Sequence, residues 1–141
     1  MAGAPAGPVM TAAAVEAFVM GTIAEGGPVF RVESVATNRA RVRLVYDDRQ
    51  LRPGGTVSGP ALMALADCAI WAALTAMTGP EEMSVTTNLT IDFLRRPEPA
   101  DVIADAALLK VGRRLATGTV TMFSDLSDKP VAHATVTYAR P

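Results

Sequence analysis

The sequence contains only one cysteine and one histidine, and these scarcities exclude several kinds of site. With Cys68 alone, the chain can form neither an intrachain disulfide framework nor a metal site built from several cysteines. His133 adds a single further ligand, so we expect no structural zinc site and no other metal. A lone thiol also suits a reducing compartment, and we predict a cytoplasmic protein.

Net charge is nearly absent as well. The 141 residues carry a formal net charge of −1, which gives no electrostatic reason to expect nucleic acid or an anionic membrane as a partner. Apolar residues make up 50% of the chain, which is enough for a folded core in one domain. The start of the chain lacks the basic region of a signal peptide. We expect a flexible tail over residues 1–10 and a single domain over residues 11–141.

The longest apolar run, residues 60–78, is about as long as a membrane span. It contains one aspartate near its middle, and no second run of this kind occurs in the sequence. A helix that is buried on all sides inside a globular domain has the same composition. We therefore favour a buried core helix over a membrane helix.

Hydrophobic periodicity predicts a helix, two strands, the apolar helix and then four more strands. Thr11 can cap a first helix over residues 11–24, and turn-forming residues predict a loop over residues 47–55. Strands are expected over residues 29–36, 39–46, 83–94, 102–111, 114–123 and 130–139. Short connections favour antiparallel pairing. We predict an α+β fold in which a curved, six-stranded antiparallel sheet wraps around one long buried helix.

Asp67 is the only ionisable side chain of the apolar run apart from the Cys68 thiol. A carboxylate among Met63, Ile70 and Trp71 loses hydration, which costs several kcal/mol unless partners are supplied. One interpretation is a structural aspartate that is bonded to backbone donors or to an arginine. The other is a functional carboxylate, because perturbed carboxylates cluster at functional sites. The residues alone leave both open.

The start of the apolar helix is suited to binding an anion. Pro60 fits the first helical position, which would place Gly59 at the N-cap. Free N–H groups at a helix start can bind an anion or an oxygen that develops charge, although these residues alone favour an ordinary capped helix start. Gly59 and Asp67 lie about 12 Å apart along a helix, too far to act on one carbonyl carbon. A shared site therefore needs a two-fold dimer with antiparallel central helices.

Several motifs in this order resemble the hotdog-fold thioesterases of the phenylacetate-pathway (PaaI-like) type. The helix-start signature of that family is His-Gly-Gly, an apolar stretch and Leu-Ala-Asp, and here it is Ser58-Gly59-Pro60, an apolar stretch and Leu65-Ala66-Asp67. Residues 85–97 are similar to its Val-Thr…Phe-Leu-Arg-Pro strand, and Gly112-Arg113 to its Gly-Arg turn. The resemblance covers residues 54–97 and, more loosely, residues 29–138.

The resemblance implies hydrolysis of an acyl-CoA thioester with a small, medium or aryl acyl group, with CoA as part of the substrate and no separate cofactor. Asp67 matches the catalytic carboxylate of the family, which acts as nucleophile or general base. Gly59 matches the glycine whose backbone N–H polarises the thioester carbonyl from the other subunit. Thr86 falls where relatives carry an assisting hydroxyl, although threonine is also ordinary in a strand. The implied assembly is a homodimer, and two dimers can pair as a homotetramer.

Departures from the family pattern keep a second function open. Ser58 stands in place of the motif histidine, Arg52 in place of a loop asparagine, and Pro60 in place of the second glycine. The histidine and the asparagine help to hold the thioester in the family. A non-catalytic acyl-CoA-binding protein is therefore the alternative to a thioesterase. A hydratase ranks last, because no histidine lies near the helix.

Other residues are candidates for contact with the substrate. The basic residues Arg95, Arg96, Arg113 and Arg114 suit the CoA phosphates, and solvated strand ends are the alternative. Met63 and Trp71 are expected in the core or in a pocket wall. Strict alternation in strand 83–94 places Thr86 on the face opposite Leu89, and His133 is expected to be exposed and not catalytic.

Overall fold

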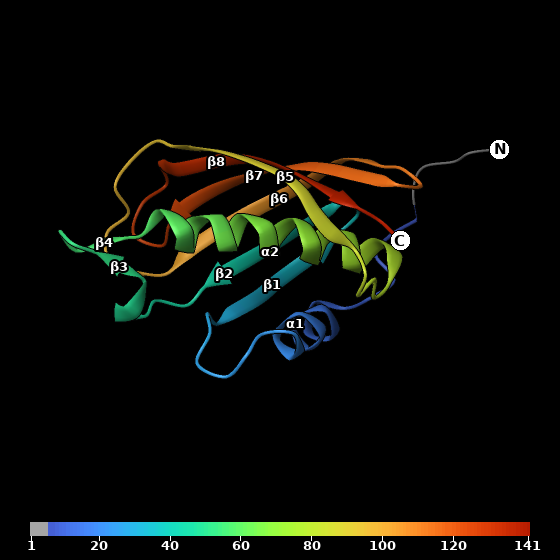
Figure 1. Ribbon diagram of the computed structural model, residues 1–141, viewed down its shortest axis with the longest axis horizontal. Helices are drawn as coiled ribbons and strands as arrows, with labels where there is room; N and C mark the ends of the chain where they lie inside the picture. Colours follow the sequence, from blue (N-terminus) through green and yellow to red (C-terminus); the bar gives the residue numbers. More distant parts are fainter. Residues whose placement is uncertain (1–5) are drawn as a thin grey trace.

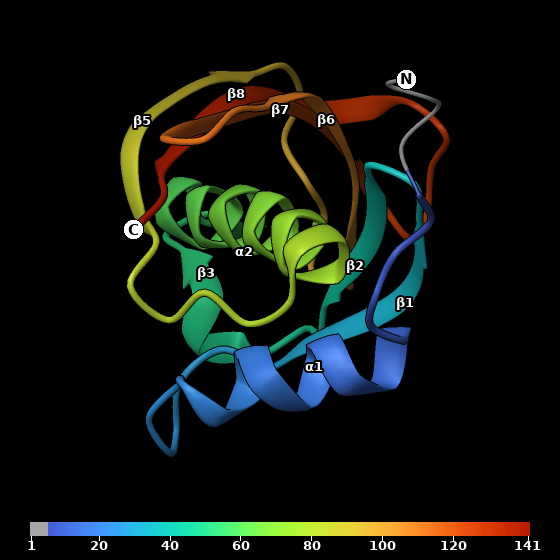
Figure 2. The same cartoon turned by 90° about the vertical axis from the view of Figure 1, so that its right-hand side faces the viewer.

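The computed structural model, which describes residues 6–141, has the predicted α+β architecture. Its strands are β1 (Phe30–Ala36), β2 (Arg39–Leu44), β5 (Val85–Phe93), β6 (Val102–Val111), β7 (Leu115–Ser124) and β8 (Pro130–Ala139). They form one antiparallel six-stranded sheet in the order β1-β2-β6-β7-β8-β5. The sheet curves around α2 (Gly59–Thr78), and α1 (Ala12–Gly21) packs against β1 and α2 (Figures 1 and 2).

The segment that was expected to be a flexible tail, residues 1–10, is described only from residue 6 onward. Within the described part, Val9 N–H donates a hydrogen bond to the Ala76 carbonyl at 2.7 Å. Thr11 Oγ1 then caps α1, as predicted, by accepting a hydrogen bond from Ala14 N–H. The domain boundary at residue 11 stays a prediction.

Helix α2 forms the centre of the core, but one of its sides is open. The helix is long and apolar enough to cross a membrane, yet 61% of that stretch is buried inside the domain. On the open side Met63 is 41% exposed, and Asp67 and Trp71 are only half-buried. The prediction of a core helix is confirmed, whereas the prediction of burial on all sides is wrong for this stripe.

The start of α2 lies one residue earlier than predicted, and Ser58 is the N-cap. Its Oγ accepts a hydrogen bond from Ala61 N–H at 3.2 Å, and its carbonyl accepts one from Leu62 N–H at 3.2 Å. The Ser58 backbone has the extended conformation of an N-cap residue, with φ −69° and ψ 154°. Serine takes this role from Gly59 because its hydroxyl can bond the free N–H groups of the first turn.

The two edge strands of the sheet differ in whether another element of the chain covers them. At the β1 edge, Val32 N–H donates to Glu16 Oε1 of α1 at 2.9 Å, so α1 covers this strand. At the other edge β5 has nothing beside it in the described part of the chain (Figure 2). Its end residues Val85 and Phe93 are 58% and 52% exposed. An uncovered, partly apolar edge strand is a template for pairing with another chain.

A β-bulge in β5 changes the direction of one candidate site residue. The register between β5 and β8 skips Thr87. Strict alternation placed Thr86 on the face opposite Leu89, and this prediction is wrong because the extra residue turns Thr86 toward α2. There the Thr86 hydroxyl reaches Asp67. A bulge re-aims a side chain without leaving a trace in an apolar–polar pattern.

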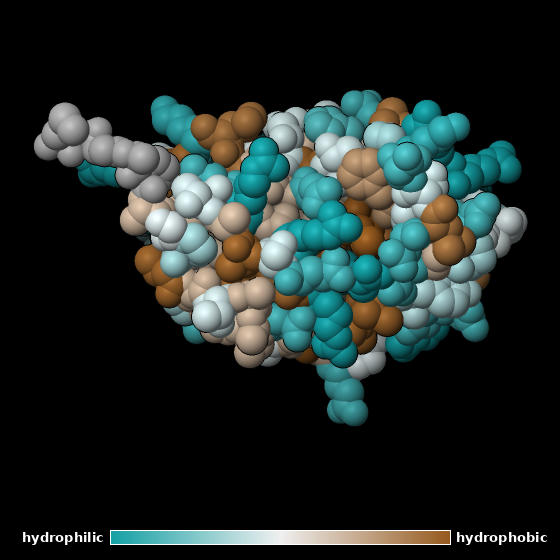
Figure 3. Space-filling view, turned by 180° about the vertical axis from the view of Figure 1, so that it is seen from behind, coloured by the Kyte–Doolittle hydropathy of each residue, from teal (hydrophilic) through white to brown (hydrophobic). Residues whose placement is uncertain are grey.

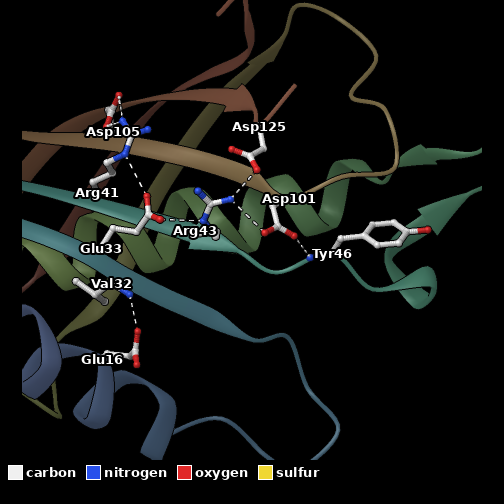
Figure 4. A network of polar contacts seen from close by, with 9 residues as sticks. All are labelled: Glu16, Val32, Glu33, Arg41, Arg43, Tyr46, Asp101, Asp105 and Asp125. Atoms are coloured by element: carbon white, nitrogen blue, oxygen red, sulfur yellow. Dashed lines mark hydrogen bonds and ion pairs between the residues drawn. The ribbon is translucent and has the colours of Figure 1, made fainter. Parts of the chain in front are cut away.

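The face of the sheet away from α2 carries a network of ion pairs. Figure 3 shows polar and apolar residues interspersed on the side of the molecule behind the sheet. Arg43 binds Glu33 at 2.9 Å and Asp125 at 3.0 Å (Figure 4). Its third partner, Asp101 at 3.1 Å, also accepts a hydrogen bond from Tyr46 N–H at 2.6 Å. The network thus fixes the start of the loop after β2, which forms one wall of the site.

Candidate active site

Asp67 lies on the open stripe of α2, and two hydroxyl groups fix its carboxylate. Thr86 Oγ1 of β5 donates to Asp67 Oδ1 at 2.6 Å, and the Tyr138 hydroxyl of β8 donates to the same oxygen at 2.7 Å. Oδ2 has no hydrogen-bond partner among residues 6–141, and within them Asp67 forms no ion pair. The carboxylate is therefore oriented, and one of its oxygens is free for chemistry.

Tyr138 is the member of this cluster that the sequence did not single out. It lies near the end of β8 among the core residues, and it is buried. Burial and the nearby charge of Asp67 raise the pKa of Tyr138 well above its ordinary value of 10.0, so at neutral pH the phenol is a hydrogen-bond donor. A buried tyrosine hydroxyl usually has a hydrogen-bond partner. The position of Tyr138 on the apolar face of its strand was therefore the sequence signal for such a contact. The identity of that partner depends on the strand register.

Cys68, the neighbour of Asp67, is unsuited to act as a nucleophile. Its side chain is buried in the core. Burial and the charge of Asp67 both raise the pKa of its thiol, which therefore stays protonated. Among residues 6–141, no three His, Cys, Asp or Glu side chains are grouped so that they could hold a metal ion.

Two adjoining cavities run along the open side of α2. The first, of about 230 Å³, lies between α1 and α2 and is lined by Asp67, Trp71 and Tyr138 among others. The second, of about 330 Å³, is lined by residues at the start of α2 and shares Pro28 and Ala64 with the first. Together they form one cleft that leads from the carboxylate to the helix start.

The first turn of α2 keeps one backbone donor free. Ser58 binds the N–H groups of Ala61 and Leu62, and Pro60 has no N–H. Gly59 N–H donates to no group in the described part of the chain. Of the first turn, only this donor is thus available to an external oxygen. Because one continuous helix holds both residues, a single chain keeps Gly59 N–H about 12 Å from Asp67.

The predicted contact residues on α2 are divided between the two cavities. Ser58 and Pro60 line the larger cavity, and Trp71 lines the smaller one. The Trp71 ring packs against Phe18 of α1 with a centroid distance of 5.2 Å. Met63 lines neither of the two cavities and is exposed on the open stripe of α2.

The loop before α2 brings a different residue to the site from the one expected. Arg52 lies in β3 (Leu51–Arg52), which pairs with β4 (Thr56–Val57); it is exposed and lies outside both cavities. Gln50, from the 3₁₀ turn Asp48–Gln50, lines the larger cavity instead. Ser58 N–H donates to the Gln50 carbonyl at 2.7 Å, which fixes this loop against the helix start.

The four candidate arginines lie away from the Asp67 carboxylate. Arg95 and Arg96 follow β5 and, with Lys129, line a third cavity of about 170 Å³. Arg113 and Arg114 are exposed in the turn between β6 and β7.

His133 also lies away from the carboxylate, on the outer face of the sheet. It is half-buried where exposure was expected, and its Nδ1 lies 3.2 Å from Thr121 Oγ1. This partner on the neighbouring strand β7 accounts for the partial burial, and it keeps the histidine on the face opposite α2.

A curved antiparallel sheet around a central helix is the hotdog architecture, and here an oriented carboxylate lies on the open side of that helix. Residues 54–131 match the family model of the Thioesterase superfamily. The chain therefore belongs to the thioesterase superfamily. The predicted fold and the PaaI-like family are confirmed.

Solved structures agree with this assignment. A proposed thioesterase from Silicibacter sp. TM1040 is 39% identical, with a TM-score of 0.85 over 95% of this chain and 94% of that chain. A mutant of the phenylacetic acid degradation protein PaaI from Thermus thermophilus is 32% identical, with a TM-score of 0.69 over 79% and 93%. Zebra fish thioesterase superfamily member 2, 21% identical, shares the fold with a TM-score of 0.80 over 94% and 99%. No curated protein matches the chain significantly.

Proposed function

We propose that the protein hydrolyses an acyl-CoA thioester to a free acid and CoA at a site that two subunits share. The observation that carries the proposal is the Asp67 carboxylate, which two hydroxyls hold by one oxygen beside the mainly apolar smaller cavity. Membership of the thioesterase superfamily supports thioester hydrolysis as the general chemistry. The proposal goes beyond this chemistry in two respects. CoA is the thiol half of the substrate, and a second subunit completes the site.

The carboxylate has two routes to hydrolysis. As a general base, Asp67 takes a proton from water while the water oxygen attacks the thioester carbon; the C–S bond then breaks and CoA leaves as its thiolate. As a nucleophile, Asp67 attacks the carbon itself, CoA leaves, and water hydrolyses the resulting anhydride. Both routes need an anionic carboxylate with one free, fixed oxygen. The hydrogen bonds from Thr86 and Tyr138 to Oδ1 supply that orientation.

The negative charge that develops on the thioester oxygen needs a donor, and we assign Gly59 N–H of the partner subunit to this role. A two-fold axis close to Met63, midway between Gly59 and Asp67, would pack the α2 stripes antiparallel and form the site twice. The same axis would pair the uncovered β5 edge with its copy in the partner. Met63, Val85 and Phe93 are exposed apolar residues on this side, and their burial against the partner would favour that assembly.

The arginines support CoA as the leaving group. Val85 and Leu115 both pair with Ala139, so the turn that carries Arg113 and Arg114 lies beside the start of β5. Arg95 and Arg96 follow its end. Antiparallel pairing of two β5 strands would bring the start of one to the end of the other. Two arginine pairs from different subunits would then gather near each site, where guanidinium groups suit phosphate oxygens.

Release of free thiol from a panel of acyl-CoA esters tests the proposed reaction. We expect turnover with at least one ester, with one equivalent of acid formed per CoA released. An ester that binds without release of thiol would instead support the non-catalytic binding protein. The replacement of the motif histidine by Ser58 and the exposed position of Arg52 are the features compatible with that outcome.

Met63→Lys is expected to weaken the dimer. Two lysine charges would face each other across the proposed axis, and like charges in contact oppose association. The substitution replaces a side chain that is 41% exposed in one chain, so the fold should persist. Light scattering should show the monomer mass of 14.7 kDa at concentrations where the unmodified protein is a dimer. Leu109→Lys, at an exposed position on β6, is the control and should stay dimeric. If Met63→Lys formed a dimer with unchanged affinity, the two-fold axis could not lie close to Met63.

Tyr138→Phe is expected to lower kcat by about tenfold or more, because a hydrogen bond to a charged group contributes about 1.5–3 kcal/mol. The variant at the other tyrosine, Tyr46→Phe, removes a hydroxyl that bonds Asp48 and is the matched control. A kcat of Tyr138→Phe equal to that of Tyr46→Phe would remove the Tyr138 hydroxyl from the reaction.

A further inference from the structure

The cavity beside Asp67 is closed on its far side by residues outside the family match. Val19 of α1, Ile23 of the following turn and Phe30 at the start of β1 line this side, whereas the superfamily model matches residues 54–131. The carboxylate side and the α1 side of the cavity therefore come from different parts of the chain. Substitutions on the α1 side can therefore change the shape of the cavity without changing the Asp67 carboxylate.

The α1 side is apolar and well supported. Val19 and Phe30 are buried, and the N–H of Val32 ties β1 to α1 through Glu16 at 2.9 Å. The Ile23 side chain is held against Gly27, where a Cβ atom would lie only 2.8 Å from Ile23 Cγ2. This wall thus has a defined position before any ligand enters.

The lining chemistry selects the kind of group that can occupy the cavity. Among residues 6–141, Asp67 is the only charged residue that lines it, and the opposite wall consists mainly of aliphatic and aromatic side chains. A charged acyl end against the α1 wall would lose hydration there without gaining a partner, because none of the described residues of that wall has a charged side chain. An apolar acyl group would instead gain the free energy of burial.

The volume limits the length of that group. The cavity measures about 230 Å³, and an apolar cavity of about 150 Å³ binds benzene. Direct scaling gives about nine aromatic carbons. A saturated chain carbon carries more hydrogens and fills more space than an aromatic one, so the cavity holds an apolar chain of about six to eight carbon atoms.

We propose that this cavity is the acyl pocket, that it takes uncharged apolar acyl groups of about six to eight carbons, and that Ile23 sets their length from the α1 side. The proposal rests on the proposed thioesterase function and names its substrate class. Ile23 is a specificity residue that contacts the acyl end and takes no part in the chemistry.

The test is kcat/KM for a series of straight-chain acyl-CoA esters from two to fourteen carbons. The unmodified protein should prefer the predicted length. Ile23→Ala should move the optimum toward longer chains by about two carbons, and Ile23→Phe should move it toward shorter ones. Leu109→Ala, at an exposed site on β6, should leave the optimum in place. A parallel loss at every length, or an optimum that neither Ile23 variant moves, would overturn the proposal.

A second measurement separates failure of the pocket from failure of the reaction. S-alkyl-CoA thioethers of the same lengths cannot be hydrolysed, and their affinities can be measured by calorimetry. The protein could hydrolyse no ester and still bind thioethers of one preferred chain length, which becomes longer in Ile23→Ala. In that case the pocket assignment stands and the hydrolysis proposal fails. Binding that does not depend on length would overturn the pocket assignment whether or not hydrolysis occurs.

Discussion

Replacing Asp67 with asparagine is expected to reduce kcat by about 10²–10⁴-fold, the usual contribution of a general base, while the melting temperature stays nearly constant. The amide keeps the size of the side chain and an oxygen that can accept from Thr86 and Tyr138. It lacks the anion that both hydrolytic routes require. Since Asp67 forms no ion pair within residues 6–141, the substitution leaves no described cation unpaired. The loss of about 3–5 kcal/mol that follows breaking a buried ion pair is therefore not expected.

Initial rates and a thermal melt on the same preparation check this prediction. Asp92→Asn is a suitable control, because Asp92 is an exposed carboxylate on β5 that lines none of the cavities described above. It should retain the rate of the unmodified protein. If Asp67→Asn did so too, the carboxylate would have no part in the reaction. A loss of rate only in proportion to lost folded protein would assign Asp67 to architecture.

Gly59→Pro is expected to lower kcat by about 10²–10³-fold, the typical cost of removing one oxyanion donor. Proline removes the Gly59 N–H, which donates to nothing in the described part of the chain. It is also favoured at the first helical position. Ser58, which would precede it, already has the extended conformation that a following proline requires, with φ −69° and ψ 154°. The helix start should therefore survive while its free donor is lost.

Gly59→Ala is the matched control for this variant. A Cβ atom at residue 59 would lie 3.3 Å from the Phe93 ring, and both substitutions introduce it. Only the alanine variant keeps the N–H, so kinetics of the two variants separate crowding from loss of the donor. Equal losses in both would assign the effect to Phe93 and would remove Gly59 N–H from the mechanism.

Most of the fold could be predicted from the sequence because its elements carry strong local signals. The apolar run up to Gly79 and the alternating strands fixed the element order, and β6 has the bounds that were predicted for it. The N-cap of α2 was misplaced by one residue, because composition alone does not show which of two adjacent residues bonds the first turn. The open stripe on α2 was also missed, since the surroundings of a helix depend on tertiary packing.

The candidate site could be predicted only in part. Asp67 and Thr86 were expected together through a family resemblance, and the bulge at Thr87 that joins them has no sequence signature. Tyr138 was assigned to the apolar face of its strand, and its contact with the carboxylate depends on the β5–β8 register. The role of α1 in the cavity depends on packing between distant segments. A cytoplasmic location and the pairing of dimers into tetramers stay predictions.

The most direct test of the shared site mixes two inactive variants. Asp67→Asn and Gly59→Pro are purified, denatured together in equal amounts and refolded so that their subunits exchange. Each mixed dimer then contains one site with an intact Asp67 facing an intact Gly59, and random pairing predicts recovery of about a quarter of the unmodified activity. Native mass spectrometry verifies that mixed dimers have formed. A site shared between subunits predicts this recovery, whereas mixed dimers without measurable hydrolysis would contradict it.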